Sequence, residues 1–297
     1  MDVLITGAAG QIGSYLFEHL IKKFEVVGLD LRRFGNELDE CLILCDLRNE
    51  RRVNEILSEL KPNVVIHLAA QVSVDRSWKN PTYDAENNIL GTLNLLNSCV
   101  KSGVKKFIYF SSAAVYGNPK YIPINEDHPL EPISPYGISK LVGEFYCRLY
   151  SSKMSVFVLR PFNVFSERTD PTNPYSGVIA KFVWRVRRGL PPVIYGDGKQ
   201  TRDFIHVKDV ISFVDLIVDL EREHGFYVYN VGTGKETSIL ELARLILKIS
   251  GLNVEPIFEK PRVGDIRRSC ADISKARELG FKPKTDLKVD LKRLLRA

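Results

Sequence analysis

A tyrosine and a lysine stand four residues apart in the segment Ser-Pro-Tyr-Gly-Ile-Ser-Lys, at Tyr136 and Lys140. Two residues at this spacing in a helix lie on one face, one turn apart, because each residue advances the helix by about 100°. A cation beside a phenol favours the ionised form and lowers the pKa of the phenol. The spacing therefore predicts a tyrosine that exchanges a proton with a substrate hydroxyl near neutral pH. A surface tyrosine beside a solvated lysine has the same spacing.

The start of the chain indicates what this pair works with. Residues 3–6 are a short apolar run that ends in the loop Gly-Ala-Ala-Gly-Gln-Ile-Gly at residues 7–13, followed by an amphipathic helix. A second apolar run, residues 26–30, ends in Asp30. This order is typical of a dinucleotide-binding fold, in which glycines let the backbone approach a pyrophosphate and the helix N-terminus supplies N–H groups. A carboxylate at Asp30 binds the adenosine ribose and repels a 2′-phosphate, so NAD is favoured over NADP.

Apolar runs continue at residues 42–44, 64–70, 107–110 and 156–159, and they alternate with helical patterns. Run 64–70 is continuously apolar, as expected of a strand in a parallel sheet buried on both faces. The sequence therefore predicts an α/β fold with a doubly wound parallel (Rossmann) sheet and a ligand at the carboxyl ends of its strands. Polar or small residues follow these ends, at Gly7, Asp30, Asp46, Ala70, Ser112 and Asn163.

Composition excludes several other classes of protein. The net charge of +6 is spread without a dense basic block, so we expect no nucleic-acid partner. No run of about 18 apolar residues is present, and an apparent strand begins two residues after Met1, so we expect neither a membrane span nor a signal peptide. The five cysteines are scattered without a matching Cys or His pair, which predicts no metal site and reduced thiols in a cytoplasm.

A series of motifs, in order along nearly the whole chain, resembles the nucleotide-sugar branch of the extended short-chain dehydrogenase/reductase family, the NAD-dependent epimerase/dehydratases. Within that family the resemblance is to the UDP-glucose 4-epimerases. The motifs are GAAGQIG, Asp30, CDL, HLAA, NNILGT, SSAAVYG, PYGISK, RPFNV, GDGKQTRDFIHVKDV and RVGDIRRSCAD.

The resemblance implies a role for each matching residue. Tyr136 becomes the acid/base, Lys140 its electrostatic partner and a ligand of the nicotinamide ribose, and Ser112 a hydrogen-bond partner of the reacting oxygen. NAD is expected against Gly7, Gly10, Gln11, Ile12, Gly13, Asp30, Asp46, Leu47, Leu68, Ala69, Ala70, Asn88, Tyr136, Lys140 and Phe162. The nucleotide sugar is expected against Ser112, Tyr136, Asn163, Val178, Tyr195, Arg202, Arg262 and Ser269, with Asn163 and the two arginines on the diphosphate.

Simpler structural roles compete at some of these positions. Ser112 has the alternative of capping local backbone, and Asn88 that of packing one helix against another. His67 and His206 are expected to be structural.

The resemblance also implies an organisation in two domains. Residues 1–165 form an NAD-binding Rossmann domain, to which residues 200–225 return. Residues 166–199 and 226–297 form a smaller, discontinuous C-terminal α/β domain for the nucleotide sugar. A homodimer is expected through a four-helix bundle of the tyrosine-bearing helix and the helix after Asn87. Apolar residues available for that bundle are Leu93, Leu96, Leu141, Phe145 and Leu149.

The implied reaction interconverts the C4 epimers of a UDP-hexose, such as UDP-glucose and UDP-galactose, through a transient 4-keto sugar. Ala113 and Ala114 stand where the 4,6-dehydratases carry Asp-Glu, which argues against a dehydratase. A uronate epimerase, a decarboxylase or a reductase of the family remains open. So does a non-catalytic NAD-binding sensor, although such proteins usually lack the tyrosine or the lysine. The small Ser269, at a position that is tyrosine in some members, predicts room for a 2-N-acetyl group.

Overall fold

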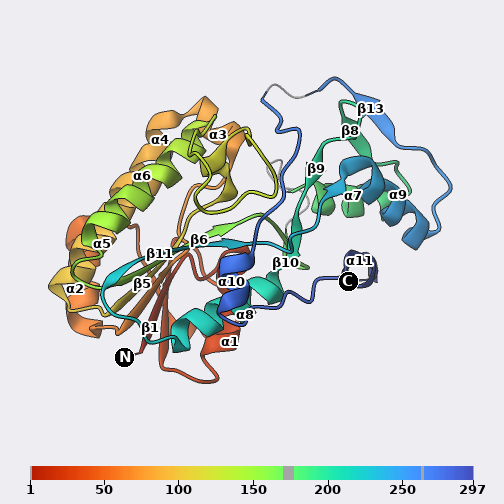
Figure 1. The fold of residues 1–297 in the computed structure, drawn as a ribbon. Coiled ribbons are helices and arrows are strands. Elements are labelled where there is room, and N and C mark those ends of the chain that lie inside the picture. Colours follow the sequence, from red (N-terminus) through yellow and green to blue (C-terminus); the bar gives the residue numbers. More distant parts are fainter. Residues whose placement is uncertain (1, 170–176, 262–263, 297) are drawn as a thin grey trace. The chain divides into compact units, whose positions relative to one another are not determined.

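The computed structural model of the chain describes residues 2–169, 177–261 and 264–296 (Figure 1). The chain divides into two compact units. Unit 1 comprises Met1–Gly117, Leu130–Arg160 and Ile211–Tyr229, and unit 2 comprises Asn118–Pro129, Pro161–Val210 and Asn230–Ala297. Tyr136, Lys140, Ser112 and the glycine loop belong to unit 1. Unit 2 contains Phe162, which is expected on NAD, and the residues Asn163, Val178, Tyr195, Arg202 and Ser269, which are expected on the nucleotide sugar. The domain bounds drawn from sequence stay a prediction.

A seven-stranded sheet dominates unit 1 (Figure 1), with the order β11-β6-β5-β4-β1-β2-β3. Its strands are β1 (Val3–Thr6), β2 (Val26–Asp30), β3 (Leu42–Leu44), β4 (Val64–His67), β5 (Lys106–Phe110), β6 (Ser155–Pro161) and β11 (Gly225–Val231). Each neighbouring pair from β6 to β3 is parallel. The strand order reverses between β1 and β4, which is where ligands bind in open α/β sheets. The predicted doubly wound Rossmann fold is confirmed.

Helices cover both faces of this sheet. In Figure 1, α2, α5 and α6 lie side by side on one face and α1 and α8 lie on the other. The buried runs of β1 and β4 explain the continuous apolar patterns, because neither face of these strands meets water. The elements of this unit are α1 (Gln11–Leu20), η1 (Glu37–Cys41), α2 (Glu50–Leu60), α3 (Val74–Lys79), α4 (Pro81–Ala85), η2 (Glu86–Leu90), α5 (Gly91–Lys101), η3 (Ala113–Tyr116), α6 (Pro135–Tyr150) and α8 (Val207–Asp219), whose first turn belongs to unit 2.

Helix α6 carries the tyrosine and the lysine, as predicted. Ser134 caps its start by accepting a 3.1 Å hydrogen bond from the Gly137 N–H, and Pro135 occupies the first turn, where its missing N–H costs nothing. A Cβ atom at Gly143 would lie 2.2 Å from the Tyr109 hydroxyl, so α6 packs on β5 too closely for any side chain there. Its buried face includes both Tyr136 and Lys140.

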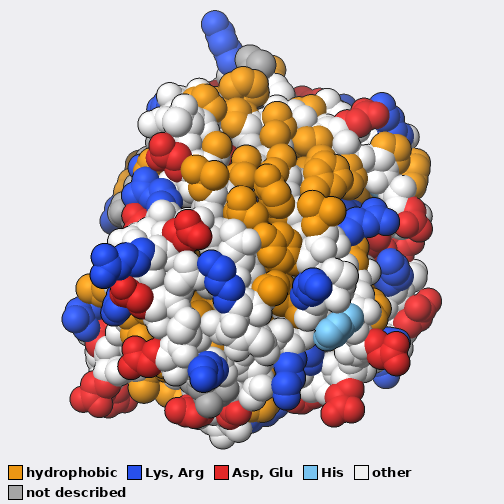
Figure 2. Space-filling view, turned by 90° about the vertical axis from the view of Figure 1, so that its left-hand side faces the viewer, with side chains coloured by type: hydrophobic (Ala, Val, Ile, Leu, Met, Phe, Trp, Pro, Cys, Tyr) orange, Lys and Arg blue, Asp and Glu red, His pale blue; other side chains and the backbone are white. Residues whose placement is uncertain are grey.

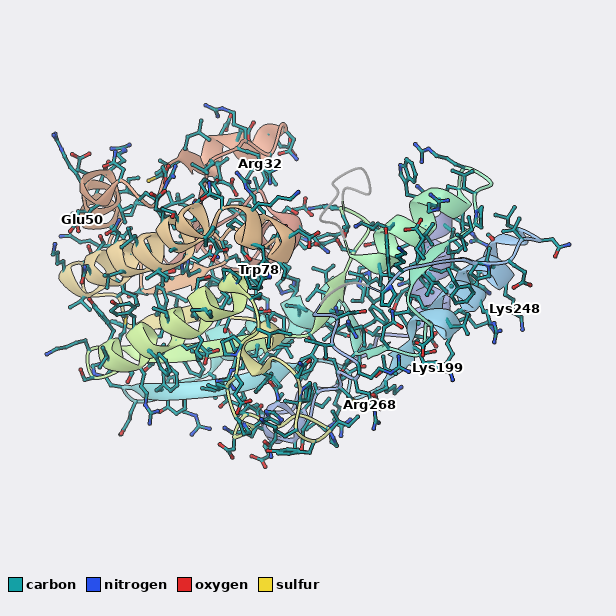
Figure 3. The ribbon with its side chains drawn as sticks, turned by 90° about the horizontal axis from the view of Figure 1, so that it is seen from above. Arg32, Glu50, Trp78, Lys199, Lys248 and Arg268 are labelled. Carbon is teal, nitrogen blue, oxygen red and sulfur yellow. The ribbon has the colours of Figure 1, made fainter. Side chains whose placement is uncertain are left out.

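Unit 2 is built from shorter elements around a core of its own. Its helices are α7 (Val178–Val186), α9 (Ile239–Ser250), α10 (Ser274–Glu278) and α11 (Leu287–Arg296), and its strand pairs are β10–β7 (Phe204–His206 with Asn163–Phe165), β12–β9 (Thr237–Ser238 with Thr201–Arg202) and β13–β8 (Ile257–Glu259 with Val193–Tyr195). Helix α9 starts with the Ser238–Glu241 capping box that its sequence predicts. Figure 3 labels three cations of this unit, Lys199, Lys248 and Arg268. None of the described helices is long and apolar enough to cross a membrane.

Candidate active site

The Tyr136 phenol is buried on the inner face of α6 and shares a hydrogen bond with the Ser112 hydroxyl. Ser112 directly follows the turn out of β5, and its Oγ also accepts a 3.1 Å hydrogen bond from the Ala114 N–H. The hydroxyl therefore both caps η3 and contacts the tyrosine, so the two roles considered for it coexist.

Burial raises the pKa of Tyr136 to about 12, and the hydrogen bond with Ser112 opposes that rise. The sequence expectation of a lowered pKa is therefore wrong for the protein alone. The physical reason is that removing the phenolate from water destabilises it by more than its hydrogen bond with Ser112 stabilises it. A tyrosine in this position needs additional positive charge nearby before it ionises.

Lys140 lies one turn further along α6 and is buried, with 3% of its surface exposed. Its Nζ donates a 2.8 Å hydrogen bond to the carbonyl oxygen of Phe110 and lies 5.1 Å from the centre of the Tyr109 ring. Burial lowers the pKa of Lys140 to about 8, while Asp84, Cys147 and Glu144 oppose that change. The amine therefore titrates near the pH at which an enzyme works.

A buried ion pair lies directly behind these groups. The Arg160 guanidinium donates to both carboxylate oxygens of Glu144, at 2.9 and 2.6 Å, and to the Tyr116 hydroxyl at 2.9 Å. The Ser111 hydroxyl donates to Glu144 at 2.5 Å. Glu144 comes one helical turn after Lys140 on α6, whereas Ser111 precedes Ser112. The network thus ties the end of β5 to the tyrosine-bearing helix, and the sequence reasoning missed it.

The glycine loop of residues 7–13 packs with unusually close backbone contacts. A Cβ atom at Gly7, which has a φ of +71°, would lie 2.6 Å from the Ala69 nitrogen, and one at Gly13 would lie 2.1 Å from the Gly7 carbonyl oxygen. The first N–H groups of α1 receive no side-chain cap from Gly10. The Gln11 Nε2 atom is buried and has no hydrogen-bond partner within the described part of the chain. These open donors beside a glycine cradle fit a dinucleotide pyrophosphate.

Acidic residues follow the next two strands of the sheet. Asp30 ends β2 and accepts hydrogen bonds from the N–H groups of Ala9 at 2.9 Å and Arg32 at 3.0 Å, so it joins the glycine loop to the strand end. Asp46 follows β3 and pairs with Arg48 at 2.6 Å, which holds the pKa of that carboxyl below its usual range. Leu47 beside it is buried. Both carboxylates stand at the carboxyl edge of the sheet, as predicted.

The segment after β4 is fixed by buried amides. Leu68 and Ala69 bond to Thr6 of the neighbouring strand, through its carbonyl oxygen at 3.0 Å and its hydroxyl at 3.3 Å. Further along, Asn88 accepts from the Gln71 N–H at 2.7 Å and donates to the Gln71 carbonyl oxygen at 2.9 Å. The Asn88 amide therefore has a structural role in packing. The contacts of Asn88, Leu68, Ala69 and Ala70 with NAD stay predictions.

His67 and His206 both make structural contacts. His67 bonds through Nδ1 to the Thr6 hydroxyl at 2.7 Å and through Nε2 to the Thr92 hydroxyl at 2.9 Å, and burial lowers its pKa to about 3. The His206 Nδ1 accepts from the Lys208 N–H at 3.2 Å, and its ring packs edge-on against Phe165.

Known proteins resemble the chain over its whole length. The model of the NAD dependent epimerase/dehydratase family matches residues 3–232. A putative UDP-glucose 4-epimerase of Methanocaldococcus jannaschii is 40% identical over 99% of this chain and 97% of its own. The chain belongs to the NAD dependent epimerase/dehydratase family.

Solved structures of this family superpose on the chain closely. The crystal structure of the Thermotoga maritima UDP-glucose 4-epimerase with UDP-glucose has a TM-score of 0.93 and 37% identity, over 100% of this chain and 98% of its own. A UDP-N-acetylglucosamine 4-epimerase of Methanobrevibacter ruminantium, in complex with UDP-N-acetylmuramic acid, has a TM-score of 0.92 and 34% identity, over 99% and 97%. The family assignment made from the motifs is confirmed.

The residues expected on the sugar nucleotide occupy varied positions in unit 2. Arg202 donates to the carbonyl oxygens of Thr201 at 2.8 Å and Ile266 at 2.7 Å, and it pairs with Asp265. Asn163 is exposed at the start of β7, Val178 begins α7, Tyr195 ends β8, Phe162 and Ser269 are buried, and Arg262 lies outside the described residues. The Arg202 guanidinium is therefore bonded to three protein groups, and the ligand contacts of all these residues stay predictions.

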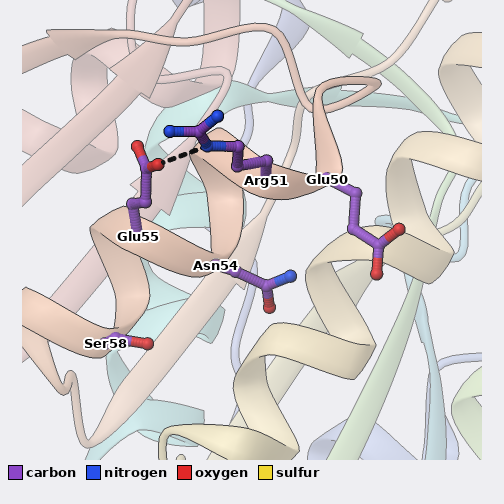
Figure 4. Close-up of a pocket in the computed structure, with 5 residues that line it drawn as sticks. All are labelled: Glu50, Arg51, Asn54, Glu55 and Ser58. Carbon is purple, nitrogen blue, oxygen red and sulfur yellow. Dashed lines mark hydrogen bonds and ion pairs between the residues drawn. The ribbon is translucent and has the colours of Figure 1, made fainter.

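A hollow elsewhere on unit 1 has no part in this site (Figure 4). It is lined by Glu50, Arg51, Asn54, Glu55 and Ser58, all from α2. Its main polar contact is the exposed ion pair between Arg51 and Glu55 at 2.9 Å, the dashed line of Figure 4. Figure 3 labels Glu50 at the start of this helix and Arg32 just after Asp30. The hollow contains none of the predicted site residues and is a solvated helix face.

Proposed function

We propose that the protein is an NAD-dependent epimerase that interconverts the C4 epimers of a UDP-hexose. The observation that carries the proposal is the grouping of Ser112, Tyr136 and Lys140 at one strand end, where Ala113 and Ala114 directly follow the serine. These groups exchange one proton with a sugar hydroxyl, and no acid or base stands next to the serine to eliminate water. The family relatives that carry the name of UDP-glucose 4-epimerase support the same activity.

Most of the residues proposed to hold the cofactor belong to unit 1. Gly7, Gly10 and Gly13 bring backbone N–H groups to the pyrophosphate, with Gln11 and Ile12 at the first turn of α1. Asp30 would bind the adenosine ribose, Asp46 and Leu47 the adenine, and Leu68, Ala69, Ala70, Asn88 and Phe162 the remaining surface of the cofactor. When bound, NAD⁺ supplies a hydride acceptor for C4 and a positive charge that favours the Tyr136 phenolate.

Tyr136 carries the proton through the reaction. As a phenolate it removes the proton of the C4 hydroxyl, while the Ser112 hydroxyl bonds the same oxygen and limits the charge on it. Lys140 stays an ammonium and stabilises the phenolate through space. The sugar loses the proton of its C4 hydroxyl and the hydride of C4 itself. After the 4-keto sugar turns over, C4 regains the hydride on its opposite face and the oxygen regains the proton, so no net oxidation occurs. Because Tyr136 returns the proton it took, its burial away from water suits the reaction.

The diphosphate and the sugar would be recognised by residues of unit 2. Arg202, Arg262 and Asn163 bind the diphosphate in this proposal, since a guanidinium fork matches phosphate oxygens. Val178 and Tyr195 lie near the nucleotide. The small, buried Ser269 leaves room at C2 of the sugar, so UDP-N-acetylhexosamines join UDP-glucose and UDP-galactose as substrates. The likeness to a UDP-N-acetylglucosamine 4-epimerase supports this extension.

A panel of nucleotide sugars tests the proposal. We expect the purified protein, with no cofactor added, to form C4 epimers from UDP-galactose, UDP-glucose and UDP-N-acetylglucosamine, as read by NMR of the anomeric protons. dTDP-glucose, GDP-mannose and UDP-glucuronate complete the panel. Turnover of UDP-glucuronate alone would replace the proposal with a uronate epimerase, and no turnover of any sugar would favour a non-catalytic NAD-binding protein.

The Tyr136→Phe variant links that activity to the site. Removing the phenol hydroxyl removes the acid/base, so kcat should fall by about 10²–10⁴-fold. The NAD content of the purified variant, measured after denaturation, should match that of the wild type. Unchanged turnover in the variant contradicts the mechanism.

We also infer a homodimer formed by α5 and α6 in a four-helix bundle. Ile138, Phe145 and Leu149 lie on one face of α6, and Phe145 and Leu149 are 56% and 72% exposed. Figure 2 faces the side of the molecule that carries these helices and shows hydrophobic side chains gathered into one patch. Leu93 and Leu141 are partly exposed. Leu96, expected in the same interface, is wholly buried in the core of unit 1 and is not available to a partner.

Sedimentation equilibrium tests the dimer. Leu149→Glu places a charge in the apolar patch and should give a monomer at concentrations where the wild type is a dimer. The control is Leu216→Glu, an exposed leucine on α8. A Leu149→Glu protein that sediments as the wild type does would contradict the interface.

A cytoplasmic location is part of the proposal. All five cysteines are free, and four of them are buried. Thiols persist in reducing compartments, whereas exported proteins tend to form disulfides. Fractionation of the source cells, with the epimerase assay as readout, tests the location.

A further inference from the structure

Asp84, on the short helix α4, is a buried carboxylate that the mechanism above does not use. It is 1% exposed. Its Oδ1 accepts hydrogen bonds from the amide groups of Gln71 at 2.7 Å and Asn88 at 3.1 Å. Both donors are neutral, and Asp84 forms no ion pair with any residue that the structure describes. Burying an ionised carboxylate is costly unless a positive charge compensates it, so an ionised Asp84 calls for a cation at a short distance.

Lys140, on the neighbouring helix α6, is a buried cation without an acidic partner in the part of the chain that the structure describes. Its ammonium is buried and bonds to the neutral Phe110 carbonyl, and it too lacks an ion pair among the described residues. The other buried acid nearby, Glu144, is already neutralised by both arms of Arg160. One buried anion and one buried cation therefore remain without partners, on helices α4 and α6 that pack against each other.

We propose that Asp84 is the counter-charge of Lys140 and a positioning residue of the active site, acting through space without touching the sugar or the cofactor. The inference rests on the proposed epimerase function and adds a residue to it. With Asp84 balancing Lys140, the ammonium stays charged in a dry site and remains able to stabilise the Tyr136 phenolate.

A chain of hydrogen bonds holds Asp84 in place relative to α6. The Asn88 amide that donates to Asp84 also donates to the Ser139 hydroxyl at 3.1 Å, and that hydroxyl donates to the Tyr136 carbonyl oxygen at 3.0 Å. Gln71, the second donor to Asp84, is itself fixed by Ser73 through bonds of 2.6 and 2.9 Å. The carboxylate therefore cannot swing away from the helix that carries Lys140.

The electrostatic surroundings of Lys140 point the same way. Among the groups that oppose the effect of burial on its pKa, Asp84 acts most strongly. Asp84 also raises the pKa of Tyr136, as a carboxylate near a phenol must. Two other cations, Arg76 of α3 and Arg48, lie over the Tyr83 ring of α4, at 4.2 and 5.7 Å from its centre. The titratable groups of the described residues that act on Lys140 or contact it are Asp84 from α4, Glu144 and Cys147 from α6, Tyr109 from β5 and His67 from β4.

The test is the pH profile of kcat/KM for UDP-galactose in Asp84→Asn, measured on the NAD-loaded enzyme. Asparagine keeps the shape and an oxygen that accepts from Gln71 and Asn88, and it removes the charge. Without the negative charge, both the ammonium and the neutral phenol are less favoured, so the pKa values of Lys140 and Tyr136 fall together. We expect the whole bell-shaped profile to move to lower pH by about one unit, which is a loss of about tenfold at alkaline pH.

Two further variants separate charge from structure. Asp84→Glu keeps the charge and should restore the position of the profile. Asp209→Asn removes a carboxylate of similar burial, bonded by the N–H groups of Lys284 at 2.9 Å and Thr285 at 2.7 Å, and should leave the profile where it is. If Asp84→Asn does not fold, Asp84→Ser provides the neutral variant, since it leaves room for a water molecule that accepts the amide hydrogen bonds.

An unmoved profile in the neutral Asp84 variant, whatever its kcat, overturns the inference, as does an equal shift in Asp209→Asn. Failure of the epimerase proposal is a separate result, because it would show as a wild-type protein without turnover.

Discussion

The Lys140 ammonium donates a 2.8 Å hydrogen bond to the carbonyl oxygen of Phe110, the last residue of β5. Ser112 stands two residues further along the same strand end and bonds the Tyr136 phenol. One strand end therefore fixes both the lysine and the tyrosine of α6, and no hydrogen bond joins these two side chains among the described residues. The catalytic geometry depends on how α6 is seated on β5 as much as on the helix itself.

Because Lys140 is buried between α6 and β5, activity and stability should depend on pH in opposite directions above about pH 8. Burial lowers the pKa of Lys140 to about 8, so above that pH the ammonium is lost and kcat/KM should fall by about tenfold per unit. Between about 8 and the ordinary value of 10.5, the unfolded chain holds a proton that the folded one has released, so the contribution of Lys140 to the free energy of unfolding rises with pH. Assays and urea unfolding from pH 7 to 10 check this. An alkaline loss of activity that coincides with unfolding would contradict it.

Removing one charge of the buried Glu144–Arg160 pair should destabilise the protein strongly, whereas replacing both residues by apolar ones should destabilise it much less. Glu144→Gln leaves the Arg160 charge buried and uncompensated, and removing one partner of such a pair destabilises a protein by about 3–5 kcal/mol. The double variant Glu144→Leu/Arg160→Met removes both charges and should recover most of that loss. The readout is the urea midpoint, and Glu55→Gln in the exposed pair with Arg51 is the control that should leave it unchanged. A single variant as stable as the wild type would show that the pair does not hold β6 to α6.

The parts of the fold that the sequence predicts are those that depend on patterns of neighbouring residues. The strands at residues 3–6, 26–30 and 42–44 are observed with the bounds that their apolar runs predict. Helix α6 carries Tyr136 and Lys140 on its buried face, as their four-residue spacing predicts, and Ser238 with Glu241 forms a capping box. Each of these depends on neighbours within a few residues, so the sequence alone carries the information.

The missed features depend on burial and on partners distant in the chain. The pKa of Tyr136 rises because packing removes water from it, which a four-residue spacing does not reveal. Arg160 pairs with Glu144 across sixteen residues, and Asp84 accepts a hydrogen bond from the side-chain amide of Gln71. The periodicity of α5 marks Leu96 as apolar without telling whether it faces the core or a partner. These are tertiary properties that local patterns leave open.

The glycine loop should not tolerate even one methyl group. In Gly13→Ala the new Cβ would meet the Gly7 carbonyl oxygen at 2.1 Å, so the loop must move away from α1. We expect the purified variant to lose its NAD and to unfold at a lower urea concentration. Gly177→Ala is the matched control, since a Cβ there meets nothing within 4 Å. Equal NAD content in both variants would show that close packing of the loop does not build the cofactor site.

The choice of sugar should depend on the size of residue 269. Ser269 is buried in unit 2, and tyrosine in its place adds a ring to space that a 2-N-acetyl group would need. We expect Ser269→Tyr to lower kcat/KM for UDP-N-acetylglucosamine by about 100-fold, because a steric clash is a stronger discriminator than the loss of one contact. The value for UDP-galactose should stay within about threefold, since that sugar carries only a hydroxyl at C2. Ser274→Tyr, an exposed serine at the start of α10, controls for the added ring. A parallel loss with both sugars would place residue 269 away from C2 and withdraw the N-acetylhexosamines from the substrates proposed for this protein.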